Sequence, residues 1–163
     1  MKTLFIMRHA KSSWDNADWS DYERPLNERG LKAAPLMGDV MKKNNFQPEI
    51  ILSSPAKRAE QTAALIKQTA GIGGAIQFDQ RIYEASPARL LEVISEQNEK
   101  IKSILLVGHN PGLEGLLKFL TGQPQPMPTA ALAVVDLKTD KWSEANSSNG
   151  NLRILIRPKE VDK

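Results

Sequence analysis

Short, continuously apolar runs recur along the first two thirds of this chain, with segments of helical period between them. The runs occupy residues 4–7, 50–52 and 104–107. A run without alternating polar residues is typical of a strand whose two faces are both buried. Strands that alternate with helices at this spacing favour βαβ units, in which the strands are parallel. We therefore predict a mostly parallel sheet covered by helices on both faces.

The segments between the runs predict four helices. The first follows Asn27, a suitable N-cap, and carries apolar residues at helical spacing. The second opens with a start signal, a serine cap followed by Pro55 in the first turn. The expected helices begin after residue 27, near residues 53–55, at residue 87 and at residue 110, and end near residues 41, 70, 98 and 120.

The last third of the chain has a different pattern. Residues 131–137 and 152–156 have the composition of strands, and Asn149-Gly150 between them is a hairpin-type turn signal. We expect antiparallel strands at one edge of the sheet. Because no repeat or linker divides the sequence, the prediction is a single domain over residues 1–163, an α/β protein folded as a three-layer α/β/α sandwich.

Composition excludes several classes of protein. The 163 residues include no cysteine and two histidines, which excludes thiolate nucleophiles, cysteine-bound metals and a His-rich metal cage. The 22 Lys and Arg residues outnumber the 19 Asp and Glu residues slightly, without a block of like charge that would indicate nucleic-acid or membrane binding. The apolar run at residues 3–7 is too short for a signal-peptide core. We expect a cytoplasmic protein that uses no cofactor and binds neither nucleic acid nor membrane.

Both histidines lie at the ends of predicted strands. His9 directly follows the first strand, and His109 follows the third apolar run after a single glycine. Ligands of open parallel sheets bind outside the carboxyl ends of the strands, so this fold would carry both rings to one edge. Each could instead be a hydrogen-bonded structural histidine. That both histidines occupy such a position favours a functional site.

Arginines accompany the histidines. Arg8 adjoins His9, Arg58 falls in the first turn of the second predicted helix, and Arg24 lies between them in the sequence. A helix start and a guanidinium both favour an anion, although an arginine can also be a solvated surface residue. Imidazoles and guanidiniums without a thiol suggest phosphoryl transfer through a ring nitrogen. The positive charges would hold the attacking imidazole neutral near pH 7.

The same residues form motifs that resemble those of the histidine phosphatase superfamily. Arg8-His9-Ala10 is similar to its Arg-His-Gly signature, with alanine in place of glycine, and residues 53–63 are similar to its "SSP…RA.QTA" segment. Residues 107–111 resemble its second histidine segment, and residues 24–30 make the SixA-type phosphohistidine phosphatases the most similar subgroup. The resemblance extends from residue 3 to about residue 137 and implies a phosphoglycerate mutase-like fold.

The resemblance also implies roles for individual residues. His9 would be the nucleophile that forms a phosphohistidine intermediate. Glu84 lies in about the right place for the acid that many relatives use as a proton donor. The implied catalytic residues are Arg8, His9, Arg58, Glu84 and His109, and the implied substrate-binding residues are Arg8, Arg24, Arg58, His109 and Thr129. No metal site is implied.

The expected substrate is phosphohistidine in another protein. A phosphoramidate has a nitrogen leaving group that solvent can protonate, whereas an ester needs a placed acid. The longest expected loop, residues 10–26, is too short to roof the site, and an open site suits a phosphorylated side chain of a partner protein. Trp14 and Trp19 in this loop would form a contact surface or cap the core.

Three alternatives remain open at this stage. The chain could be a phosphatase or mutase for small phosphate esters, in which Glu84 would matter. It could be a phosphate-binding module without catalysis. A metallohydrolase would need more ligands than two histidines, and carboxylates such as Asp15 or Asp18 would have to supply them.

Overall fold

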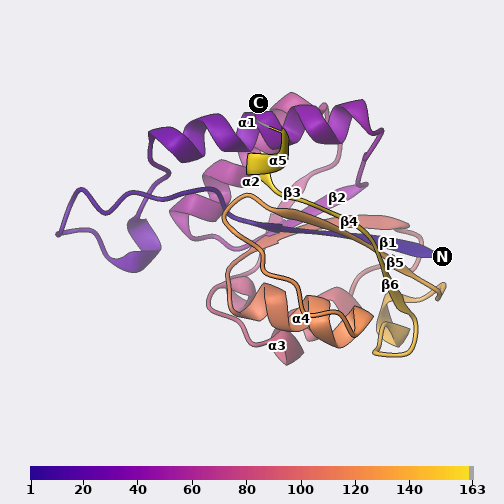
Figure 1. Cartoon of the computed structure of the whole chain (residues 1–163). Coiled ribbons are helices and arrows are strands. Elements are labelled where there is room, and N and C mark those ends of the chain that lie inside the picture. Colours follow the sequence, from indigo (N-terminus) through magenta and orange to yellow (C-terminus); the bar gives the residue numbers. More distant parts are fainter. Residues whose placement is uncertain (162–163) are drawn as a thin grey trace.

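A six-stranded sheet organises the computed structural model, which describes residues 1–161 (Figure 1). The strand order is β3-β2-β4-β1-β5-β6. Strands β1 to β4 run parallel to their neighbours within this group, and β5 and β6 add an antiparallel edge. The prediction of a mostly parallel sheet with an antiparallel edge is confirmed. The strands are β1 (Lys2–Arg8), β2 (Ile50–Ser53), β3 (Ile76–Phe78), β4 (Ser103–Gly108), β5 (Leu132–Leu137) and β6 (Gly150–Ile156).

Helices cover both faces of this sheet, as Figure 1 shows. Helices α1 and α2 lie on one side, α3 and α4 on the other, and the short α5 lies beside α1. The three-layer α/β/α sandwich is therefore confirmed. The helices are α1 (Glu28–Lys43), α2 (Lys57–Ala70), α3 (Pro87–Ser95), α4 (Gly112–Thr121) and α5 (Pro158–Val161).

Burial on both faces explains the continuous apolar run of β1. Leu4 and Ile6 pack into the core beneath α3 and α4, whereas Phe5 and Met7 pack into the core beneath α1 and α2. All four side chains are buried. Since successive side chains of a strand point to opposite faces, a strand between two helical layers needs apolar residues at every position.

Three expected helix boundaries are wrong, and one of them is the start of α4, which lies at Gly112 instead of residue 110. Helix α2 begins at Lys57 after Ala56, which has no capping side chain, so the Ser-Pro signal at residues 53–55 does not start the helix. Instead Ser53 ends β2, and the Ser54 hydroxyl lies within hydrogen-bond distance of His109, just after β4. Helix α3 ends at Ser95, before the expected residue 98.

The connection between β5 and β6 also differs from the prediction. Residues 138–149 form a longer loop that contains a short 3-10 helix, η3 (Trp142–Glu144), and Gly150 is already the first residue of β6. Asn149-Gly150 therefore lies at the end of this loop and is not a two-residue hairpin turn. The antiparallel pairing itself is present, with Leu137 opposite Gly150.

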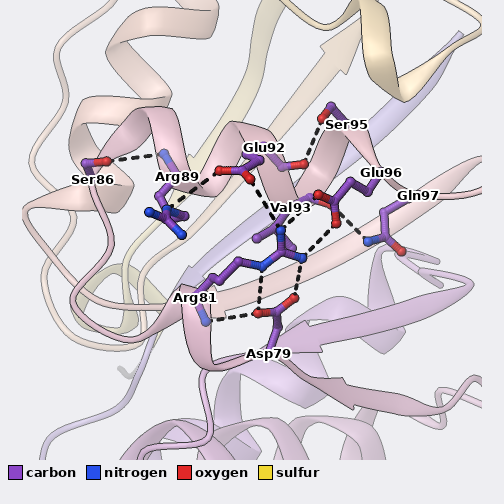
Figure 2. Close-up of polar contacts among 9 residues, drawn as sticks. All are labelled: Asp79, Arg81, Ser86, Arg89, Glu92, Val93, Ser95, Glu96 and Gln97. Atoms are coloured by element: carbon purple, nitrogen blue, oxygen red, sulfur yellow. Dashed lines mark hydrogen bonds and ion pairs between the residues drawn. The ribbon is translucent and has the colours of Figure 1, made fainter.

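The segment between β3 and α3 is fixed by a network of charges around Arg81 (Figure 2). Arg81 lies in a second 3-10 helix, η2 (Gln80–Ile82), and forms ion pairs with Asp79 at 2.8 Å and with Glu96 at 2.7 Å. At the other end, Gly112 allows α4 to approach this segment, because a Cβ there would lie 2.2 Å from the Ala85 carbonyl oxygen. These contacts hold residues 83–85 beside the start of α4.

Helix length and polarity also determine whether a helix can cross a membrane. Among the described residues, the helices are all too short or too polar to cross a bilayer.

Candidate active site

The parallel register of β1 and β4 brings the two histidines together. Arg8 pairs with Gly108 as the last residue of each strand, and His9 and His109 each follow by one position. The His9 amide donates to the Gly108 carbonyl at 3.0 Å. The ring centroids lie 5.1 Å apart, and both side chains are buried. The structure therefore places the two imidazoles side by side at the carboxyl edge of the sheet.

Helix α2 adds Arg58 to this edge. Arg58 is the second residue of the helix and is buried. One turn later, the Thr62 hydroxyl donates to the Arg58 carbonyl at 2.7 Å and accepts from the Ala10 amide at 2.9 Å. These two bonds fix the backbone directly after His9 against α2.

These groups surround a cavity of about 440 Å³. Its lining includes each residue to which the sequence analysis gave a role: Arg8, His9, Arg24, Arg58, Glu84, His109 and Thr129. The other lining residues are Lys11, Ser12, Trp14, Asp21 and Asn110. Because the lining holds four Arg and Lys side chains against two carboxylates, the cavity favours an anion.

Hydrogen bonding holds the His9 ring in one tautomer. Nδ1 lies 2.7 Å from the Ala10 carbonyl oxygen, which can only accept, so Nδ1 carries the proton and Nε2 carries the lone pair. Burial, together with the charges of Arg58 and Arg8, lowers the pKa of His9 to about 4 despite the bond to Ala10. The ring is therefore neutral near pH 7 and has an unprotonated nitrogen, as a nucleophile requires.

His109 is bonded through its other ring nitrogen. Nε2 lies 2.7 Å from Ser54 Oγ, and this oxygen already accepts from the Ala56 amide. Since the Ser54 hydroxyl has no other acceptor among the described residues, we assign it as the donor to Nε2, which leaves the ring proton on Nδ1. Burial, followed by the neighbouring His9 and Arg58, lowers the pKa of His109 to about 3. This ring is also neutral near pH 7.

Three buried side-chain nitrogens within residues 1–161 have no hydrogen-bond partner in the described protein, and all three belong to residues of this cavity. They are Arg8 Nε, Arg58 Nε and His109 Nδ1. A buried donor without a partner costs about 1–3 kcal/mol, so folded proteins leave few of them. Three such nitrogens around one cavity fit the oxygens of a tetrahedral oxyanion.

Asp21 is a site residue that the sequence analysis missed. Its carbonyl oxygen accepts from Arg58 Nη1 at 2.6 Å, and its carboxylate accepts from Arg58 Nη2 at 3.0 Å. The same carboxylate accepts from Arg24 and from the Tyr83 hydroxyl, at 3.0 and 2.6 Å. Although partial burial opposes ionisation, the hydrogen bonds from Tyr83 and Arg58 lower the pKa of Asp21 to about 2.

These contacts occupy both terminal nitrogens of Arg58 and leave its Nε edge without a partner among the residues that the structure describes. The only signal in the sequence is the position of Asp21, three residues before Arg24 in a polar loop.

Glu84 and Thr129 lie at the margin of the cavity. Glu84 is exposed and has left-handed backbone geometry, with φ of 50°. Thr129 is half-buried, and the next residue, Ala130, is also left-handed, with φ of 63°. The Ala130 amide donates to the carbonyl oxygens of Arg8 and His9 at 3.1 and 3.0 Å. Since such geometry is costly for a residue with a side chain, its presence twice beside one cavity points to a functional constraint.

No three His, Asp or Glu side chains of the described residues lie close enough to hold a metal ion together. Asp15 and Asp18 are exposed residues of the loop after β1.

Comparisons with known proteins agree on one family. The model of the histidine phosphatase superfamily (branch 1) matches residues 4–90. The phosphohistidine phosphatase SixA of Escherichia coli K12 is 31% identical over 160 residues, which cover 95% of this chain and 93% of that protein. An uncharacterised protein of Mycobacterium tuberculosis is 34% identical over 110 residues, 68% of this chain and 66% of its own length.

Solved structures give the same result. A protein of Agrobacterium tumefaciens assigned as the phosphohistidine phosphatase SixA has a TM-score of 0.84 at 29% identity, with 96% of this chain and 98% of that chain covered. The protein histidine phosphatase SixA in complex with tungstate has a TM-score of 0.79 at 28% identity, with 97% and 98% covered. The prediction of the family from the motifs at residues 8–10, 53–63 and 107–111 is confirmed: this chain belongs to the histidine phosphatase superfamily.

Proposed function

We propose that the chain is a phosphatase that uses His9 as its nucleophile, needs no metal, and removes the phosphoryl group from phosphohistidine in another protein. The observation that carries this proposal is one cationic cavity that is lined by a neutral His9 and by residues with three buried nitrogens that have no partner within residues 1–161. The similarity to the E. coli phosphohistidine phosphatase supports the substrate class. The SixA complex with tungstate, a tetrahedral oxyanion, supports phosphate binding.

In the first step, the lone pair on His9 Nε2 attacks phosphorus and forms a P–N bond while the bond from phosphorus to the substrate imidazole breaks. The electron pair of the broken bond stays on the substrate nitrogen, which solvent can protonate. Arg8, Arg58 and His109 would donate hydrogen bonds to the phosphoryl oxygens and stabilise their charge in the transition state.

In the second step, water attacks phosphorus and the bond to His9 Nε2 breaks. The phosphoryl group leaves with the water oxygen and its protons as inorganic phosphate, and the electron pair of the broken P–N bond returns to His9 Nε2. The hydrogen bond from Nδ1 to the Ala10 carbonyl keeps the tautomer correct throughout, so that Nε2 is again ready to attack.

A labelling experiment tests this proposal. A carrier protein with radiolabelled phosphohistidine is mixed with the enzyme, the reaction is quenched in alkali, and label on the enzyme is measured for wild type, His9→Ala and Asp136→Asn. We expect label on wild type and on Asp136→Asn, whose ion pair with Arg153 lies outside the cavity, and none on His9→Ala. Turnover that survives in His9→Ala would refute His9 as the nucleophile.

A second candidate, hydrolysis of small phosphate esters, is favoured by Glu84 alone, because this carboxylate lines the cavity in a strained backbone conformation. An ester needs a placed acid, and general acid catalysis contributes about 10²–10⁴-fold. Rapid turnover of a sugar phosphate, lost by about that factor in Glu84→Gln, would establish this candidate. Preference for phosphohistidine, unchanged in Glu84→Gln, would support the first.

A non-catalytic phosphate-binding module makes a different prediction. It would bind phosphate with the same affinity in wild type and in His9→Asn, and no label would appear on His9 with any phosphoryl donor.

A further inference from the structure

The two tryptophans of the loop between β1 and α1 have different surroundings. Trp19 is half-buried and lines a neighbouring hollow with Tyr22 and Pro55. Trp14 is 76% exposed and lines the cavity that contains His9. Because most of the Trp14 side chain is exposed, a ligand that covers its ring would remove apolar surface from water. Trp14 is therefore the tryptophan to which a ligand of the site has access.

One face of the Trp14 ring is already covered. The guanidinium carbon of Arg24 lies 3.5 Å from the ring centroid, a cation–π contact. Arg24 is itself buried and is held by Ser12 at 3.0 Å and by the Asp21 carboxylate at 3.0 Å. The indole thus rests on a guanidinium that cannot move easily, and its exposure leaves the opposite face open.

The positions of the charged and donor groups in the cavity indicate which part of a substrate would reach the open face of Trp14. The phosphoryl group is drawn to the charges of Arg8 and Arg58 and to the donor nitrogen of the neutral His109 ring, which lie around His9. The leaving group must then extend away from these groups toward the exposed part of the lining. There Trp14 offers a flat aromatic surface on which another planar ring can stack.

We propose that the open face of Trp14 is a leaving-group subsite that stacks on the imidazole ring of phosphohistidine. This proposal rests on the proposed function and names the part of the substrate that this loop recognises. It makes Trp14 a specificity residue: it binds the ring that leaves and contributes nothing to the phosphoryl group itself.

Two small substrates distinguish binding of the imidazole ring from binding of the phosphoryl group, because phosphoimidazole contains the ring and phosphoramidate lacks it. For Trp14→Ala we expect kcat/KM with phosphoimidazole and with a phosphohistidine peptide to fall about 2- to 12-fold, the range typical of an aromatic stack. With phosphoramidate, kcat/KM should not change. Trp14→Phe, which keeps a flat ring, should restore most of the loss, and Trp19→Ala should behave as wild type with all three substrates.

Binding of tungstate provides a control for the integrity of the site. We expect the same tungstate affinity in wild type and Trp14→Ala, since Arg24 keeps its bonds to Ser12 and Asp21. An equal loss with phosphoramidate and phosphoimidazole, or no loss with phosphoimidazole, would overturn the subsite. If wild type turns over none of the three substrates and carries no label on His9, the proposed function fails and the subsite fails with it.

Discussion

Acid should destabilise this protein through its two histidines before it affects the carboxylates. Burial lowers the pKa of His9 to about 4 and that of His109 to about 3, whereas both have a pKa of 6.5 in the unfolded chain. Below pH 6.5 the unfolded chain therefore binds protons that the folded protein does not. The free energy of unfolding must fall as the pH falls through this window.

The size of the effect follows from these pKa values. For one histidine with a pKa of 6.5 unfolded and about 4 folded, lowering the pH from 7.0 to 5.5 reduces the free energy of unfolding by about 1.2 kcal/mol. Since His109 behaves in the same way, the two together give about 2.5 kcal/mol. Asp21, with a pKa of about 2, stays ionised throughout this range and does not contribute.

The assay is urea unfolding followed by circular dichroism at pH 7.0 and 5.5, with variants that lack one titrating ring. In His9→Asn the amide can still donate to the Ala10 carbonyl, and in His109→Gln the side-chain oxygen can still accept from Ser54. Each variant should lose about half as much stability as wild type over this pH interval. If wild type loses less than about 1 kcal/mol, or if both variants lose as much as wild type, the assignment of two neutral, buried histidines is wrong.

Three further changes test the contacts that shape the site. Asp21→Asn should lower kcat/KM for phosphohistidine about 5- to 10-fold, because Arg58 loses its charged partner, whereas Asp136→Asn, which removes an ion pair outside the cavity, should leave it unchanged. A higher kcat/KM in Asp21→Asn would contradict the positioning role. Arg58→Lys should weaken tungstate binding about 10-fold in a calorimetric titration, since lysine lacks the guanidinium fork. Equal tungstate affinity in wild type and Arg58→Lys would refute a contact between the Arg58 guanidinium and the anion. Gly112→Ala should lower the free energy of unfolding in urea by about 1–3 kcal/mol, because its Cβ would lie 2.2 Å from a backbone carbonyl oxygen. Gly73→Ala, which has open space around it, should stay within about 0.5 kcal/mol of wild type. Equal stability of the two variants would show that the close approach at Gly112 is relieved at little cost.

The central strands and the histidine pair could be predicted because a local pattern determines them. A strand buried on both faces must be apolar throughout, so β1 and β4 are visible in the sequence. Parallel pairing in register then brings the residues after both strands to the same place, and His9 and His109 follow without any information about side-chain packing.

Other features have no local signature. Strand β3 has three residues, of which Gln77 and Phe78 are exposed, so its apolar pattern is too short to detect. The start of α2 is misplaced because Ser54 contacts His109, 55 residues away, instead of capping the helix. Asp21 likewise meets Arg58 and Tyr83 from distant segments, at separations of 37 and 62 residues. Contacts of this kind arise only once the layers have packed.

The hydrogen-bond partners of the ring nitrogens distinguish a functional histidine pair from a structural one. A structural histidine at a strand end would be expected to have a partner for each ring nitrogen, since an unpaired buried donor costs about 1–3 kcal/mol. His109 satisfies only Nε2 within the described protein, and two guanidinium nitrogens beside it, on Arg8 and Arg58, are also without a partner. A chain selected for stability alone would pair or remove these groups. A bound oxyanion would offset the cost that they impose, and for this reason the unpaired nitrogens argue for phosphate chemistry independently of the sequence motifs.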